Sequence, residues 1–393
     1  MLSAPLRGTN GHQLIGIGAV QKATAGAGVA SARDSTWVLL NPAAIDDLEL
    51  RLDVSVEMFA PERSIEPEGP DLPALGGQPL ANRDAGRSED TSIFWIPSIG
   101  AAIPTADGTF GVGWYGVCGM GVDYHYPRTT IPGFSGQYYD YRTEYAVSKL
   151  ALAYARPVGG GLTLGIALNL DMAQFRSDML TSAFTQTKGD FERDTAFGAG
   201  FQLGFVQHLG CVAVGGTYIS RQWFQEFDRY DDLLGGPLDL PQMVQLGVSW
   251  RVHPKLELLT DYKYINWSGV PALGEEPHEG GFGWDDQHVI KVGAVWTVTP
   301  RCRLSTGYSY GRSPIDEQIV FANALFPAIV EHHATLGVSF DLTEHSSVHF
   351  TYMHAFENTL EDSGKGDMYS QAGAGTEITL VEDTFTLQYS FRF

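Results

Sequence analysis

The chain has 393 residues, of which 44% are hydrophobic, 12% aromatic and 18% charged. This aromatic content excludes a disordered chain, because disordered chains are poor in residues that can be buried. The net charge of -21 argues against a role in binding nucleic acid. The 3 cysteines are far apart and odd in number, which fits neither a disulfide framework nor a zinc site.

The first 47 residues are rich in glycine and alanine and do not alternate in polarity. They are too long for a simple tail and too apolar for a solvated linker. Residues 1–7 also lack the charged head and apolar core of a signal peptide. The chain is therefore either cytoplasmic or a mature form without its signal peptide, and the segments that follow decide between the two.

From residue 48 onward, apolar and polar residues alternate in segments of about ten residues. A period of two over this length predicts a strand with one apolar and one polar face, and ten residues suffice for a tilted strand to cross a membrane. No apolar run is long enough for a membrane helix. The predicted strands are 48–58, 92–104, 109–124, 143–155, 162–175, 196–207, 211–220, 243–252, 256–266, 287–298, 302–310, 332–342, 346–355 and 384–393.

The connections between these strands alternate strictly between short and long. The long ones are 59–91, 125–142, 176–195, 221–242, 267–286, 311–331 and 356–383. Outer-membrane barrels have an even number of strands, short periplasmic turns and long external loops. The sequence therefore predicts an all-β fold, a fourteen-stranded antiparallel transmembrane β-barrel formed by residues 48–393 with seven long extracellular loops. Residues 1–47 are predicted to form a plug inside it, because so wide a barrel needs a filler unless it is an open pore.

Aromatic residues near the ends of the predicted strands fit the aromatic girdles that lie at the two membrane surfaces. They are Trp95, Tyr154, Trp250, Trp267, Trp296, Tyr310 and Phe393.

Several motifs resemble the FadL-type family of outer-membrane transporters for long-chain fatty acids and hydrocarbons. The runs that carry the resemblance are Gly16 to Val20, Gly26 to Ala30, Asn41-Pro42-Ala43, Tyr264 to Ser268, Tyr308 to Ile315 and the C-terminal Phe393. The resemblance extends over the whole chain, and its most specific part lies in the plug, at Gly16, Gly18, Asn41, Pro42 and Ala43.

This resemblance implies an N-terminal hatch and a lateral exit through the wall near a distorted third strand. It implies uptake of a hydrophobic ligand by diffusion, without ATP or a coupling ion. Five glycines crowd the third predicted strand, and glycines inside strands mark bulges or close backbone approach. They are Gly111, Gly113, Gly116, Gly119 and Gly121. Alternatively, these small residues only make room for the plug.

The resemblance also implies a low-affinity capture site in the external loops. In loop 221–242, apolar residues spaced by three and four predict a short helix with an apolar face. The capture residues predicted from this loop and from loop 176–195 are Trp223, Phe224, Phe227, Leu233, Met179 and Phe184. The cations predicted to orient a carboxylate are Lys149, Arg251 and Arg176, with Lys263, Lys291 and Arg303 also in lumen phase; each may instead pair with a lumen acid such as Asp171, Glu257 or Asp261.

Two enzyme-like motifs lie inside strand patterns and are interpreted as coincidences. Residues 307–311 match the nucleophile elbow and residues 111–116 match the dinucleotide fingerprint, yet both motifs require a following helix. His332 and His333 are adjacent on a strand, so they point to opposite faces and cannot easily share a metal ion. We therefore expect no enzymatic activity, catalytic residue, metal or cofactor.

The sequence predicts passive transport of a hydrophobic ligand across the outer membrane of a Gram-negative bacterium. A general aqueous porin for small polar solutes is the alternative, and a fatty acid, an alkane and an aromatic hydrocarbon all remain open as ligands. The expected partners are the ligand, outer-membrane lipid and lipopolysaccharide, and the barrel-assembly machinery through Phe393. We expect a monomer.

Overall fold

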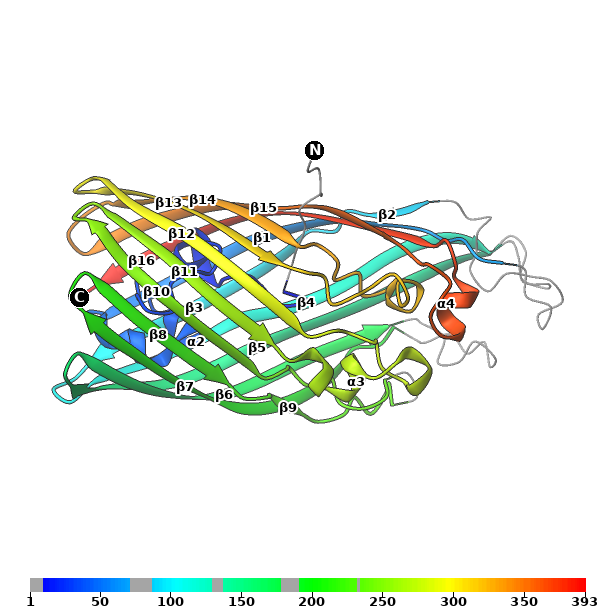
Figure 1. Cartoon of the computed structure of the whole chain (residues 1–393), viewed down its shortest axis with the longest axis horizontal. Coiled ribbons are helices and arrows are strands. Elements are labelled where there is room, and N and C mark those ends of the chain that lie inside the picture. The colour runs from blue at the N-terminus through cyan, green and yellow to red at the C-terminus, as the bar shows by residue number, and fades with distance from the viewer. Residues whose placement is uncertain (1–9, 71–86, 129–136, 178–190, 232–233) are drawn as a thin grey trace.

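A closed antiparallel barrel dominates the structure, which is a computed structural model (Figure 1). It describes residues 10–70, 87–128, 137–177, 191–231 and 234–393. Each strand pairs with its neighbour in sequence, and pairing of the last long strand with the first closes the barrel. The fourteen long strands are β1 (Arg51–Glu66), β3 (Phe94–Pro104), β4 (Thr109–Arg128), β5 (Gln137–Gly159), β6 (Leu162–Ser177), β7 (Asp194–Leu209), β8 (Val212–Ile219), β10 (Met243–His253), β11 (Leu256–Ile265), β12 (Gln287–Thr299), β13 (Cys302–Gly311), β14 (His332–Asp341), β15 (Ser346–Glu361) and β16 (Glu377–Arg392).

These strands confirm the predicted fold, and each overlaps one of the fourteen predicted segments. The main error lies at the long-loop end, where β1, β4, β5, β15 and β16 run further than predicted. Residues 137–142, for example, continue the ladder between β4 and β5 although they were assigned to a loop. Period-two apolar patterning ends where lipid contact ends, whereas backbone pairing continues beyond the membrane.

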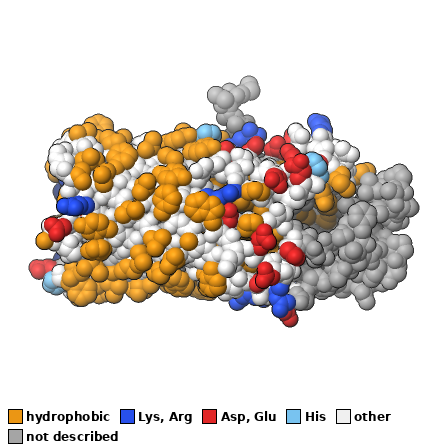
Figure 2. All heavy atoms as spheres, turned by 90° about the horizontal axis from the view of Figure 1, so that it is seen from below, with side chains coloured by type: hydrophobic (Ala, Val, Ile, Leu, Met, Phe, Trp, Pro, Cys, Tyr) orange, Lys and Arg blue, Asp and Glu red, His pale blue; other side chains and the backbone are white. Residues whose placement is uncertain are grey.

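Side chains of the barrel alternate between an apolar outer face and a polar inner face. On β6, Leu168 is 48% exposed and the adjacent Asn169 is 1% exposed. Figure 2 shows the resulting hydrophobic belt around the barrel, with acidic side chains gathered toward the long-loop end. A barrel of this kind offers lipid an apolar surface while keeping its polar groups inside.

The remaining elements are short. At the long-loop end they are β2 (Ser88–Asp90), β9 (Trp223–Phe224), η4 (Trp267–Gly269), α3 (Pro271–Gly274), η5 (Pro277–Glu279), η6 (Phe321–Asn323) and α4 (Met368–Ala372). No helix in the described part of the chain has the length and apolar character needed to span a membrane.

Residues 10–47, here called the N-terminal segment, lie inside the barrel (Figure 1) and contain α1 (Gly18–Lys22), α2 (Trp37–Leu40) and η1 (Pro42–Asp47). Lys22 pairs with Glu57 of β1 at 2.6 Å. The backbone N–H groups of Gly28 and Val29 both donate to Asp261 of β11 at 2.9 Å. Polar groups of the wall therefore satisfy those of the segment, as burial requires.

One half of the barrel interior at the short-turn end is an apolar core. There α2 and η1 pack against small side chains from β3, β5, β6, β7 and β8, and the buried residues are Trp37, Val38, Leu40, Ala43, Ala44, Ile45 and Leu48 with Ala102, Ala151, Ala153, Ala155, Ala167, Val206 and Ala213. Alanine on the wall leaves room for the larger side chains of the segment, so the two surfaces interdigitate.

Candidate ligand cavity and the gap in the barrel wall

The long-loop mouth of the barrel is filled by apolar side chains from the connections that follow β8, β11 and β13. The buried residues of these connections include Phe224, Phe227, Tyr230, Leu234, Leu238, Leu240, Trp267, Val270, Leu273, Trp284, Ile315, Ile319, Val320, Phe326, Ile329 and Val330. This set is called the mouth cluster below. It gives the long-loop end of the barrel an apolar interior.

Two of the predicted capture residues join the mouth cluster and one does not. Phe224 and Phe227 are buried, and the ring of Phe227 lies 5.5 Å from that of Phe175. Trp223 is 53% exposed, because it precedes Phe224 on β9 and successive strand side chains point to opposite faces. Trp223 therefore lies outside the mouth cluster, and its part in capture stays a prediction. Leu233, Met179 and Phe184 lie outside the described residues.

The predicted helix in residues 221–242 is wrong for the described part of that connection. The chain forms β9 and turns instead, and Gln222 and Leu240 exchange backbone hydrogen bonds of 2.9 and 3.2 Å. The Asp239 carboxylate also accepts from the Phe224 N–H at 2.8 Å. The apolar spacing arises from packing of turns into the mouth, and not from a helical face.

Trp267 is not a girdle residue, which corrects a second prediction. It lies in η4, is fully buried, and donates its indole N–H to Gln287 at 2.9 Å. His12 of the N-terminal segment inserts beside it, with 4.9 Å between the ring centroids. Burial lowers the pKa of His12 to about 3, so the ring is neutral at physiological pH. The segment thus contributes directly to the mouth cluster.

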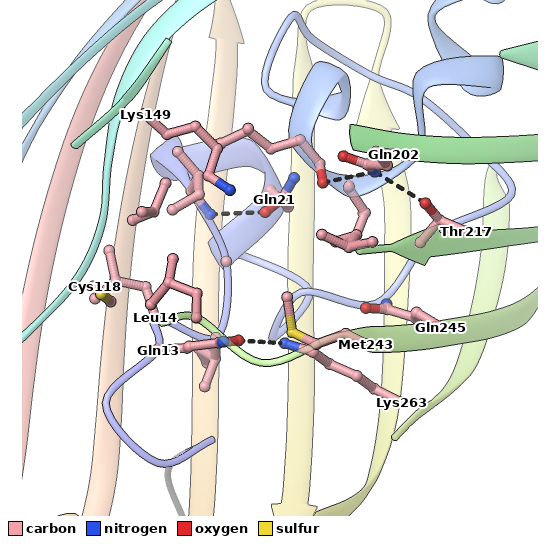
Figure 3. Close-up of a pocket in the computed structure, with 18 of the residues that line it drawn as sticks. Gln13, Leu14, Gln21, Cys118, Lys149, Gln202, Thr217, Met243, Gln245 and Lys263 are labelled. Carbon is pink, nitrogen blue, oxygen red and sulfur yellow. Dashed lines mark hydrogen bonds between the residues drawn. The ribbon is translucent and has the colours of Figure 1, made fainter. Parts of the chain in front are cut away.

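A cavity of about 100 Å³ lies directly below the mouth cluster, between the N-terminal segment and the wall (Figure 3). Its apolar lining comes from Leu14, Ile15, Ile17, Leu39, Leu40, Val117, Ile219, Leu240 and Met243. Its polar lining comes from Gln13, Gln21, Gln202, Thr217 and Gln245 and from Lys149, Lys263 and Lys291. The cavity therefore combines an apolar surface with three ammonium groups, and it is called the lysine cavity below.

The three lysines differ in their partners. Lys149 lies 3.3 Å from the Asp171 carboxylate and donates to Gln222 at 3.0 Å. Lys263 donates to the side chain of Gln13 at 3.1 Å, and Lys291 donates to the carbonyl of Ile15 at 3.0 Å. Both are buried, and neither has a carboxylate within ion-pair distance among the described residues. Asp261 interacts electrostatically with Lys291, whereas no acidic group does so with Lys263 among the described residues. A buried charge without a counter-charge is costly, so the ammonium group of Lys263 above all favours an anion in the cavity.

The other two predicted cations do not reach this cavity. Arg176 donates to Glu144 at 2.8 Å and stacks over the ring of Phe191, 4.3 Å from its centroid. Arg251 lies near the short-turn end and lines a separate cavity. Of these three candidate cations only Lys149 lines the cavity, because the strand positions of Arg176 and Arg251 lie at different heights in the barrel.

The wall beside the lysine cavity contains a gap between β3 and β4. The ladder between these strands runs from the pair Pro104–Thr109 to the pair Ser98–Tyr115 and ends there. Beyond that point β3 stays paired with β1, and β4 stays paired with β5 with a register shift between Gly116 and Cys118. Above this stretch, the Asp123 N–H donates to Asp90 of β2 at 2.8 Å. The gap is the stretch of β4 between the pair Ser98–Tyr115 and the hydrogen bond from Asp123 to Asp90.

Other parts of the chain satisfy the backbone groups of β4 in the gap. The Leu14 N–H donates to the carbonyl of Val117 at 3.4 Å, and the Gly119 N–H donates to the carbonyl of His12 at 3.3 Å. The guanidinium of Arg63 donates to the carbonyl of Gly121. Unpaired backbone groups are costly inside a membrane, and here the N-terminal segment and one side chain replace the missing strand.

The five glycines of β4 fall into two groups. Gly111 and Gly113 are buried on the inner face, where an added Cβ at Gly111 would come within 2.4 Å of Val38 and one at Gly113 within 2.1 Å of the Tyr115 hydroxyl. These two make room for the N-terminal segment and for Tyr115. Gly116, Gly119 and Gly121 lie along the gap, beyond the last pair with β3.

The residues singled out in the N-terminal segment hold it against the wall. Gly18 has a φ of +68°, and a Cβ there would come within 2.6 Å of Gln388. Asn41 donates to the carbonyls of Val29 at 2.7 Å and Phe205 at 3.0 Å. Pro42 and Ala43 open η1.

Gly16 lines the lysine cavity. Among the residues that sequence reasoning did not assign to a site are Gln13, Leu14, Gln202, Gln245 and Arg63. The phase of the strands could have indicated Gln202 and Gln245, because both face the lumen.

Residues 235–393 match the sequence model of a family described as outer membrane protein transport protein (OMPP1/FadL/TodX). The resemblance to the FadL-type family is thereby confirmed. The described fold agrees over the full length, which includes the part before residue 235.

The toluene transporter TodX of Pseudomonas putida has the same fold as this barrel, with a TM-score of 0.73 at 14% identity over 97% of this chain and 99% of TodX. A FadL homologue of Pseudomonas aeruginosa gives a TM-score of 0.73 at 15% identity, and the match covers 98% of this chain and 100% of the homologue. The toluene transporter TbuX of Ralstonia pickettii gives a TM-score of 0.68 at 15% identity, and the match covers 97% of this chain and 99% of TbuX. At these identities the likeness concerns the fold. A comparison with curated proteins gave no match.

The matched family is one of outer-membrane transport proteins. In barrels of the outer membrane the short turns face the periplasm and the long connections face the exterior. The lysine cavity lies between the apolar mouth at the long-loop end and the gap in the barrel wall.

Proposed function

We propose that this protein carries hydrophobic carboxylic acids, such as long-chain fatty acids, passively across the outer membrane. The observation that carries the proposal is the cavity in which Lys263 and Lys291 are buried without a carboxylate partner in the described chain. The acid is captured at the mouth cluster, its head group enters the lysine cavity, and it leaves sideways through the β3–β4 gap. Residues 1–47 act as the plug that blocks an aqueous path.

The apolar part of the ligand contributes most of the affinity, about 0.8 kcal/mol for each buried methylene. A cavity of about 100 Å³ holds only a head group and a few carbons, so a longer chain extends upward into the mouth cluster. The carboxylate accepts charge-assisted hydrogen bonds from Lys263 and Lys291, which are about twice as strong as neutral ones. Because the lysines supply the distinction between ligands, an acid is favoured over a neutral hydrocarbon.

Exit through the wall rests on the gap and on how it is closed. His12 and Leu14 bond to β4 at the gap, while Gln13 and Leu14 also line the lysine cavity. Movement of this short stretch would join the cavity to the lipid without breaking any ladder between barrel strands.

Paired uptake measurements test the choice of ligand. Cells carrying the protein are given oleate and, separately, dodecane, and Lys263→Met is compared with the wild type. We expect oleate uptake to fall about tenfold while dodecane uptake is kept, since each charge-assisted bond contributes roughly 1.5–3 kcal/mol. Lys365→Met, which removes an exposed loop lysine, is the matched control. An equal loss for both ligands, or no loss for oleate, would reject the carboxylate assignment.

A further inference from the structure

A second cavity lies at the periplasmic end, between the N-terminal segment and the wall formed by β10 to β16 and β1. Its volume is about 420 Å³, and it shares no lining residue with the lysine cavity. Its lining includes the turn residues Pro254 and Lys255, which places it at the periplasmic mouth. The volume falls within the range of small-molecule sites, roughly 300–1,000 Å³.

The charge of this cavity is opposite to that of the protein. Six cationic side chains line it: Arg33, Arg51, Arg251, Lys255, Arg303 and Arg392. Glu257 is the acidic residue of the lining. A chain with 46 acidic and 25 basic residues has thus gathered basic groups around one interior space.

Internal acids do not neutralise this group. Arg33 pairs with Glu257 at 2.9 Å and Arg51 pairs with Asp53 at 2.7 Å. Arg303 and Arg392 share the single carboxylate of Asp341, at 2.9 and 3.4 Å.

Three carboxylates therefore pair with four of the six cations, and only Glu257 among them lines the cavity. In the described ranges no ion pair involves Arg251 or Lys255. In addition, the Nη1 atom of Arg33 and the Nε atom of Arg392 are buried without a hydrogen-bond acceptor. The cavity has unused donors as well as unused charge.

Hydroxyl and imidazole groups complete the polar lining. Ser305, Ser339, Ser347 and His349 face the cavity, and Ser339 and His349 are hydrogen-bonded to each other at 2.7 Å. Arginine forks bind carboxylate and phosphate groups in a bidentate manner, and serine hydroxyls add further donors. The combination is that of an anion-binding site.

We propose that this basic cavity binds a small organic anion that carries a carboxylate or a phosphate and enters from the periplasm. Arg251 and Lys255 provide the unpaired positive charge, and the guanidinium groups of Arg33 and Arg392 provide the open donors. The N-terminal segment separates this site from the lysine cavity, so anion binding here does not depend on the ligand that the barrel transports.

Calorimetric titration of the full-length protein in a zwitterionic detergent at low ionic strength tests the proposal. The two probes are inorganic phosphate and succinate, a small hydrophilic dicarboxylate. The double variant Arg251→Gln with Lys255→Gln removes the two unpaired charges and leaves the three ion-paired carboxylates in place. We expect saturable binding by the wild type and at least a tenfold weaker dissociation constant for the double variant.

A control with the same change of charge is Arg156→Gln with Lys365→Gln, because both residues are exposed, as Arg251 and Lys255 are, and neither lines the cavity. Its affinity should equal that of the wild type. Binding of succinate alone would mean that the anion must be organic, whereas binding of phosphate as well would mean that charge suffices; both support the site. Absence of saturable binding, or an equal loss in the control, would overturn it.

Discussion

Two junctions of the barrel wall are closed in different ways. The seam between β16 and β1 is a continuous ladder of sixteen residue pairs, from Arg51–Arg392 to Glu66–Glu377. The junction between β3 and β4 has seven pairs, and beyond them the N-terminal segment, Arg63 and Asp90 satisfy the backbone of β4. A ladder opens only by losing many hydrogen bonds together, whereas these separate contacts can be released a few at a time. We therefore propose the second junction, and not the first, as the route.

A disulfide across each junction should give the largest contrast. Gln13 forms an isolated bridge with Cys118, and directly opposed residues of antiparallel strands are close enough for a disulfide. Oxidised Gln13→Cys should lose oleate uptake about a hundredfold and regain it on reduction, because the segment can no longer leave the gap. Gln13→Ser reports the effect of losing the Gln13 side chain itself.

The matched cross-link is placed at the seam, between cysteines at Val54 and Tyr389, which face each other on the outer surface. Its oxidation should leave uptake unchanged. If both disulfides or neither impair uptake, the two junctions are equivalent for transport.

Arg63→Met should produce the next largest effect. Arg63 is buried and lies 2.6 Å from Asp90, so its loss leaves a buried carboxylate unpaired and the carbonyl of Gly121 without its donor. Breaking a buried pair costs about 3–5 kcal/mol. We expect a lower unfolding midpoint in urea and a higher single-channel conductance. Arg301→Met, at an exposed turn, is the control; an unchanged midpoint and conductance would show that Arg63 does not hold the gap.

The smallest expected effect concerns the hold of the seam on the N-terminal segment. Gln388 of β16 donates to Asp34 at 2.7 Å. Burial, together with the charge of Asp53, raises the pKa of Asp34 to about 6. Because the folded-state pKa exceeds the unfolded value, folding takes up a proton between about pH 4 and 6, and stability falls as the pH rises through that window.

Asp34→Asn removes this dependence and should be more stable than the wild type at pH 7.5 by about 1 kcal/mol, with little difference near pH 4. Urea unfolding at the two pH values measures it. A difference that is the same at both would contradict the titration of Asp34.

The sequence predicted the wall well and its exceptions poorly. Outward residues such as Leu168 follow a local period of two, which lipid on one side and polar groups on the other impose on each strand. The lumen phase of Lys263 was predictable for the same reason. Its partner Gln13 is 250 residues away in sequence, and no local pattern encodes such a contact. Arg63 lies in a stretch assigned to a loop, because β1 continues beyond the point where its apolar and polar residues stop alternating.

Closure of the barrel around the N-terminal segment also sets the order of assembly. The segment precedes β1, and β1 cannot find its last partner until β16 exists, so the wall remains an open sheet until the whole chain is present. Contacts from Ala19 and Asp34 to Gln388 join the enclosed segment to the strand that completes the circle. These contacts cannot form before β16 is in place, so the segment gains its full set of wall contacts only when the circle closes. Chain order and topology thus link the packing of the segment to the closure of the barrel.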